Sequence, residues 1–128
     1  GLRRDLSTTL DLAVSTRPVT SERIELDIVL RDRAGTAIDR GELMIAVSAP
    51  VAVLSLDSIG ADCEFRGRIA CRIAPVPAGM AASVSLQLAI DPARPPEVLT
   101  EFVQNGQVRA EASIASTTAA TPTQPGAR

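Results

Sequence analysis

The stretch of sequence that decides the fold is Cys63–Cys71, with the sequence CEFRGRIAC. Its two cysteines are the only ones in the chain, and Gly67 lies midway between them. If the chain reverses at Gly67, the two cysteines face each other across a β-hairpin. Phe65 then faces Ile69 on the same side, because alternate residues of a strand share a face. The stretch therefore predicts a hairpin that a Cys63–Cys71 disulfide staples.

A metal half-site and a pair of free thiols are the alternatives to this disulfide. Structural zinc sites need four nitrogen or sulfur ligands, and the chain has no histidine and no third cysteine. Free thiols remain an alternative if the protein stays in a reducing compartment. The symmetric spacing about Gly67 favours the disulfide, which closes a loop of nine residues. In the chain-entropy model such a loop adds about 2.5 kcal/mol of stability, and it implies an oxidising compartment.

Strand signals continue on both sides of the hairpin. The clearest are Ile24–Leu30 and Val84–Ile90, in which every second residue is Ile, Leu or Val. Shorter runs separated by turn residues follow the same pattern at Asp11–Ser15, Glu42–Ser48, Val51–Leu56 and Gln107–Ala115. About seven short strands without an amphipathic helix predict an all-β fold, an Ig-like antiparallel β-sandwich.

The same pattern predicts the core and one exception to the strands. The core should contain Leu26, Ile28, Ile69, Ile73, Leu86, Leu88 and Ile114. With only two Phe and no Trp or Tyr in the chain, this core is expected to be mainly aliphatic. After the proline-rich bend at 91–96, Pro96–Val103 is predicted as one short helical turn.

Composition divides the chain into three parts. Residues 1–9 are predicted as an N-terminal linker, 10–116 as the sandwich, and 117–128 as a flexible Thr/Pro/Ala-rich tail, because this tail has no large core-forming residue. The chain begins with Gly1 and not Met, so we expect a processed product or a part of a longer protein. Its two uncharged stretches are interrupted by proline, and we predict no membrane span.

The order of these features resembles the DUF11-type repeat domains, which are Ig-like modules of large bacterial and archaeal surface or secreted proteins. The resemblance rests on a set of residues that match in order and spacing: Cys63, Gly67, Cys71, Ile73, Val76, Gly79, Val84, Leu86, Leu88, Ala110, Ala112 and Ile114. It covers about residues 11–115. The connection at 91–105 is longer than in that pattern, and Arg31–Gly35 replaces its usual turn. The resemblance implies an extracytoplasmic spacer or adhesive role and transfers no catalytic residue.

Composition also argues against an enzyme. Without His, Lys, Tyr or Trp, the chain lacks most groups that perform acid–base, nucleophilic or stacking chemistry. A pair of carboxylates remains, as in glycosidases, but we interpret Asp57, Asp62 and Glu64 as solvated loop residues. Asp32 and Asp39 lie in another acidic connection, yet no spaced Asp-x-Asp-x-Asp-Gly loop for calcium occurs. We therefore predict no cofactor and no metal site.

The net charge and the distribution of the arginines indicate which partners the chain could bind. The net charge is −2 and no basic block occurs, so nucleic-acid binding is not expected. Arg66, Arg68 and Arg72 cluster around the hairpin and are the candidate interaction residues, although such charges also keep a sheet edge soluble.

The function expected from all of this is a non-enzymatic structural or protein-interaction module, a spacer or adhesive domain of a larger bacterial protein. It would act at the cell surface, in the periplasm or after secretion, with other domains of its own polypeptide or another envelope protein as partners. A ligand-binding accessory module, such as a carbohydrate-binding domain, is the alternative. A third reading is an assembly subunit that a partner strand completes.

Overall fold

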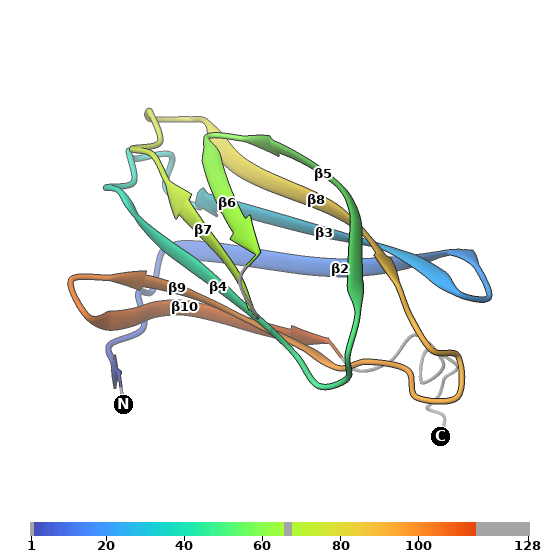
Figure 1. The fold of residues 1–128 in the computed structure, drawn as a ribbon. Coiled ribbons are helices and arrows are strands. Elements are labelled where there is room, and N and C mark those ends of the chain that lie inside the picture. Colours follow the sequence, from blue (N-terminus) through green and yellow to red (C-terminus); the bar gives the residue numbers. More distant parts are fainter. Residues whose placement is uncertain (1, 66–67, 115–128) are drawn as a thin grey trace, which may run out of the picture.

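The computed structural model describes residues 2–65 and 68–114, and these residues form strands joined by turns. The strands pack as two sheets (Figure 1). Ten strands lie within the described ranges: β1 Arg3–Arg4, β2 Leu10–Thr20, β3 Arg23–Asp32, β4 Gly41–Val47, β5 Ala52–Ile59, β6 Ala61–Phe65, β7 Ile69–Ile73, β8 Ala81–Ala89, β9 Val98–Gln104 and β10 Gln107–Ile114.

The strand order is that of an Ig-like sandwich with an added hairpin. One sheet has the order β2-β3-β8-β5 and the other β1-β10-β9-β4-β7-β6. In the immunoglobulin fold, strands A, B, E and D form one sheet and C, F and G the other. Here β2, β3, β8 and β5 take the first four places, and β4, β9 and β10 take the other three. The cysteine hairpin, β6–β7, extends the second sheet beyond β4. The predicted fold class is therefore confirmed.

The core lies between the two sheets and is built by alternation along the central strands. Leu26 pairs with Leu86, and neither side chain is exposed to solvent. Phe102 on β9 is also fully buried and is the largest side chain of the core. The predicted core residues Leu26, Ile28, Ile69, Ile73, Leu86 and Leu88 are buried, and Ile114 is half-buried against the same cluster. The predicted register of both long strands is thus confirmed.

The predicted helical turn at Pro96–Val103 is wrong, because most of this segment belongs to strand β9. β9 pairs with β4 on one side and with β10 on the other. Val98, Thr100 and Phe102 alternate into the core, as expected for β-branched and aromatic residues in a strand. Leu99 points outward although it is apolar, and it hides the period of two in the sequence.

The first predicted strand, Asp11–Ser15, extends further in both directions than expected. β2 runs from Leu10 to Thr20 and passes through Pro18, which an edge strand tolerates because one side of it forms no ladder. Before β2, the segment predicted as a linker runs beside β10. Arg3 and Arg4 pair with β10 in parallel, and the amides of Asp5 and Ser7 donate to the carbonyl oxygens of Val108 and Arg109.

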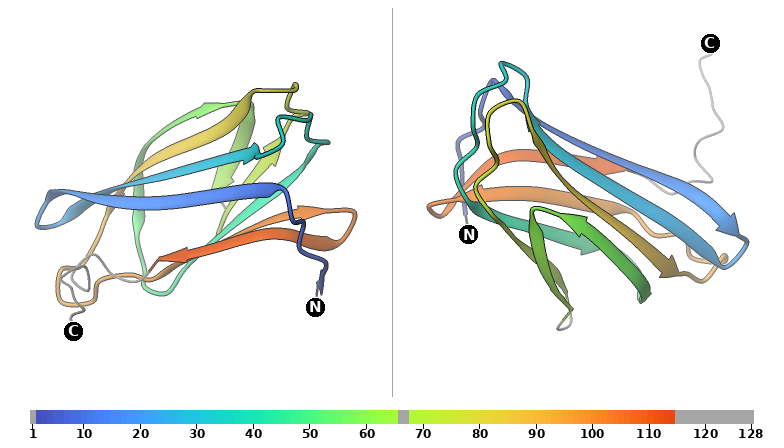
Figure 2. Two further views of the ribbon diagram at one scale, coloured as in Figure 1. Left: turned by 180° about the vertical axis from the view of Figure 1, so that it is seen from behind. Right: turned by 90° about the horizontal axis from the view of Figure 1, so that it is seen from above.

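The connection from β5 to β6 crosses between the sheets at a single residue. β5 ends at Ile59 in the first sheet and β6 begins at Ala61 in the second, so Gly60 alone forms the corner. Its φ of 75° lies in the left-handed region that glycine adopts without strain. β5 and β6 meet at this corner and diverge away from it (Figure 2, right).

On the opposite side of the sandwich from β5 and β6, β2 and β10 approach each other and close the space between the sheets. The predicted tail at 117–128 lies outside the described residues. No helix long and apolar enough to cross a membrane is found in the described part of the chain.

Candidate functional site

The cysteine hairpin is the first component of the candidate site. Cys63 and Cys71 form a disulfide, and their Cα atoms lie 3.9 Å apart as directly opposed residues of β6 and β7. Cys71 is buried in the core and Cys63 packs against it. Phe65 pairs with Ile69 as predicted. The disulfide thus ties the edge strand β6 to β7 and fixes the direction in which Phe65 leaves the hairpin.

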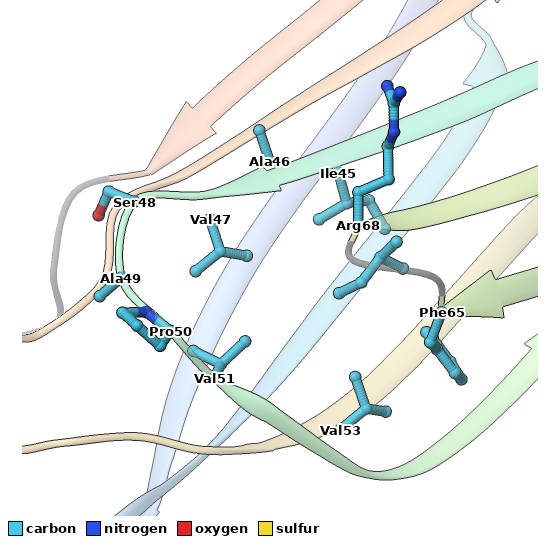
Figure 3. A pocket seen from close by; sticks show the side chains of 11 residues that line it. Ile45, Ala46, Val47, Ser48, Ala49, Pro50, Val51, Val53, Phe65 and Arg68 are labelled. Atoms are coloured by element: carbon cyan, nitrogen blue, oxygen red, sulfur yellow. The ribbon is translucent and has the colours of Figure 1, made fainter.

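A groove opens where β5 and β6 are farthest from their common corner. It has a volume of about 600 Å³ and lies between the end of β4, the start of β5 and residues Phe65, Arg68 and Ile69 of the hairpin (Figure 3). Nine of its eleven lining residues have apolar side chains, Ser48 and Arg68 being the exceptions, while backbone groups add polar surface: Ile45, Ala46, Val47, Ser48, Ala49, Pro50, Val51, Val53, Phe65, Arg68 and Ile69. The two sheets separate here because the disulfide hairpin belongs to one of them and β5 to the other.

The groove has one aromatic lining residue, Phe65, and this side chain is exposed. Phe65 is 44% exposed although its partner Ile69 is buried. Leu54 on β5 is 47% exposed at a β-bulge between Val53 and Ser55. A bulge leaves one residue of a strand unpaired and bends the strand locally. Phe65 therefore remains accessible at the groove, and Leu54 is exposed at the bulge next to the lining residue Val53.

The three predicted interaction arginines are not brought together in one site. Arg68 lines the groove and forms no ion pair with any residue in the described ranges. Arg72 is paired with Asp62 across the hairpin, with 3.1 Å between Nη2 and Oδ2, and it does not line the groove. Arg66 lies outside the described residues. Their role in interactions stays a prediction, and Arg68 is the one that the groove places beside an apolar surface.

The acidic residues weighed as catalytic or calcium-binding groups form no common site. Within 2–65 and 68–114 there is no group of three or more His, Cys, Asp or Glu side chains that could hold a metal ion. Asp32 belongs to a turn: Thr36 and the amide of Ala34 donate hydrogen bonds to its carboxylate, as does the hydroxyl of Thr9. The hydrogen bond from Thr36 is the main cause that holds the pKa of Asp32 below its ordinary value.

Sequence reasoning did not find the apolar walls of the groove. Val47, Val51 and Val53 were counted only as strand residues on either side of the break at Ala49–Pro50. A signal was present, since Pro50 separates two apolar runs that end up in different sheets. The opening between the sheets depends on where the hairpin packs, and this is a long-range property.

Comparison with known proteins gives the fold and no family. No protein-family model matches the chain, and no curated protein matches its sequence. The structure is similar to the collagen-binding domain from a Staphylococcus aureus adhesin, with a TM-score of 0.53 and 7% sequence identity over 85% of this chain and 98% of that domain.

Two further solved structures are matched over most of this chain. A GH20 exo-β-N-acetylglucosaminidase from Vibrio harveyi gives a TM-score of 0.51 and 11% identity over 83% of this chain, which spans only 17% of the length of that enzyme. ChBD3 from Thermococcus kodakarensis KOD1 gives a TM-score of 0.49 and 16% identity over 84% of this chain and 93% of that chain. At these identities the chain shares with the adhesin domain its fold, a two-sheet β-sandwich.

Proposed function

We propose that this chain is a non-enzymatic structural or protein-interaction module of a larger bacterial protein that acts outside the cytoplasm. The single observation that carries the proposal is the Cys63–Cys71 disulfide, which staples an edge hairpin of an Ig-like sandwich. Disulfides persist in oxidising compartments and are rare in the cytosol. The DUF11-type resemblance, which implies a surface or secreted protein, points in the same direction.

The chemistry of the surface supports binding or spacing over catalysis. Thr100 is the only polar or charged residue with a buried side chain in the described ranges. A general acid that works at neutral pH needs a carboxyl group in an apolar, desolvated place to raise its pKa, and none of the described carboxylates is buried in this way. The chain has no Trp or Tyr, and of its two Phe residues only Phe65 is exposed, so the aromatic surface on which a sugar ring could stack is limited to one side chain.

The likeness to the adhesin domain supports this reading at the level of fold. That domain shows that a two-sheet sandwich with this arrangement of strands serves as a binding module in one bacterial adhesin. Collagen is the ligand of that domain and is not assigned to this chain, because a shared fold does not imply a shared ligand.

Localisation together with the redox state of the cysteines tests the proposal. Antibodies against the domain should label intact cells of the producing bacterium or its periplasmic or secreted fraction, and the parent protein should migrate as a disulfide-bonded species after alkylation without reduction. A parent protein found only in the cytosol with two alkylated thiols would refute the proposal. As a control, a cytosolic protein of the same cells should be labelled only after permeabilisation.

A further inference from the structure

The outer edge of β5 is the least protected strand edge of the sandwich. β5 has eight residues and one neighbour, β8. Its only charged residue is Asp57, and it has no Pro, Lys or Arg. Proteins usually block free edges with charges, proline, short strands or β-bulges, because a free edge pairs with other chains. Besides Asp57, the bulge between Val53 and Ser55 is the one such protection that β5 has.

The other strand edges carry these protections. β6 has only five residues and presents Asp62 and Glu64. β2 contains Arg17 and Pro18, and β1 is two residues long. A strand that joins the sandwich from outside therefore has one suitable edge, that of β5.

The groove lies beneath this edge and is shaped for the side chains of such a strand. A strand added beside β5 lies about 4.8 Å from it and directs every second side chain toward the space between the sheets. The groove in this space is lined by Val51 just before β5, by Val53 on β5 and by Phe65 on β6. Apolar side chains at alternate positions would fill the groove and cover Phe65.

Arg68 adds a charge preference at the rim. Among residues 2–65 and 68–114 it is the only charged residue that lines the groove, and no ion pair with another of these residues involves it. A carboxylate of a partner placed beside it gains a charge-assisted hydrogen bond at the border of an apolar surface, where such bonds are stronger than in open solvent. The charge therefore favours an acidic residue near one end of the added strand.

We propose that this groove binds an extended segment of another polypeptide, which adds as a strand to the edge of β5, places apolar side chains between the sheets and sets an Asp or Glu against Arg68. The inference rests on the proposed function and names the chemistry of its partner. The mode is β-strand addition, in which main-chain hydrogen bonds give affinity and alternate side-chain pockets give specificity.

Two other occupants fit the groove less well. Residues 115–128 of the chain contain no Ile, Leu, Val, Phe, Met, Asp or Glu, so they lack both groups that the groove selects. A second copy that paired through its own β5 would keep Val53 and Leu56 over its own second sheet, where they already pack against the core. The groove of the first copy would then stay unfilled.

Selection from a phage-displayed library of random eight-residue peptides on the disulfide-bonded full chain tests the proposal. We expect enriched peptides with apolar residues at every second position, no proline between them and an Asp or Glu near one end. Synthetic copies should bind in fluorescence anisotropy. Arg68→Glu should weaken their binding about tenfold and should select Lys or Arg at the acidic position. The control Arg72→Glu makes the same substitution on β7, four residues after Arg68 and outside the groove, and should change affinity less than twofold.

Several outcomes would overturn the proposal. They are a selection without enrichment, enriched peptides that bind the Arg68→Glu variant equally well, and binding that survives Val53→Asp in a variant with an unchanged circular dichroism spectrum. If sedimentation equilibrium shows a dimer that peptides dissociate, a second copy is the occupant. If removal of residues 117–128 tightens peptide binding more than tenfold, the tail is the occupant of the groove. A protein that selects no peptide but is disulfide-bonded and extracytoplasmic would leave the proposed function standing and refute the groove alone.

Discussion

Removing the disulfide is the perturbation whose size the structure predicts best. The bond closes a loop of nine residues, counted from Cys63 to Cys71. In the chain-entropy model, freeing such a loop in the unfolded state costs about 2.5 kcal/mol of folding free energy at 25 °C. Replacing both cysteines with alanine also removes the buried sulfur of Cys71, which adds about 1 kcal/mol for the lost packing. The double variant should therefore be about 3.5 kcal/mol less stable.

Urea unfolding of three forms of the protein separates the contributions of the loop and of the buried sulfur. Urea unfolding of the oxidised protein, of the same protein in a reducing agent and of the Cys63→Ala/Cys71→Ala variant gives three free energies by linear extrapolation. The reduced protein keeps both sulfur atoms and should lose only the 2.5 kcal/mol of loop entropy. With an unfolding entropy of about 2.1 cal/mol/K for each of roughly 110 described residues, this corresponds to a melting temperature lower by about 11 °C.

The binding of peptides gives an independent check on the same bond. Because the disulfide holds β6 against β7, its reduction should free Phe65 from its place in the groove wall. Affinity for the selected peptides should then fall at temperatures where the reduced protein is still folded. A reduced protein within 0.5 kcal/mol of the oxidised one, about a fifth of the expected loss, with unchanged peptide affinity, would refute the reasoning.

Three smaller changes test other parts of the fold. Gly41→Ala should destabilise by about 1–3 kcal/mol in urea unfolding, because a Cβ at this position would lie 2.5 Å from the carbonyl oxygen of Val103; an unchanged midpoint would contradict this contact. Thr100→Val should stabilise by about 1 kcal/mol, since the buried hydroxyl has no hydrogen-bond partner within the described residues; a loss of stability would mean that the hydroxyl has one. The carboxyl group of Asp32 should titrate below its ordinary pKa of 3.8 in an NMR titration. A lowered folded pKa contributes stability above the unfolded value that is lost as the pH falls through the folded value, so Asp32→Asn should flatten the acid side of the stability profile below about pH 4; an unchanged profile would contradict the turn.

Local patterns in the sequence predicted the parts of the fold that depend on neighbouring residues. The alternation of Ile24–Leu30 and the spacing of the two cysteines about Gly67 each fix a face or a hairpin within ten residues, and the structure confirms both. β9 was missed because its outward residue Leu99 is apolar and breaks the alternation. The pairing of Arg3 and Arg4 with β10 joins residues more than a hundred positions apart, and two residues carry no strand pattern of their own.

The candidate site was predicted only in part, for the same physical reason. Cys63, Cys71 and Arg68 were found because a local motif contains them. The groove depends on the corner at Gly60, which sends β5 and β6 into different sheets. No local pattern indicates which sheet the hairpin joins. The hairpin pairs with the side of β4 that β9 does not occupy, and β4 lies earlier in the chain.

The parallel pairing of β1 with β10 has a mechanical consequence. Tension applied to the two ends of the sandwich would pull β1 toward its N-terminus and β10 toward its C-terminus, in opposite directions along the same ladder. Such a load strains the hydrogen bonds of Asp5 and Ser7 and the ion pair between Arg4 and Glu111 at the same time, and does not open them one after another. A module joined in this way within a longer chain would resist stretching until the whole β1–β10 pairing breaks. The disulfide would then limit how far the remaining chain can extend.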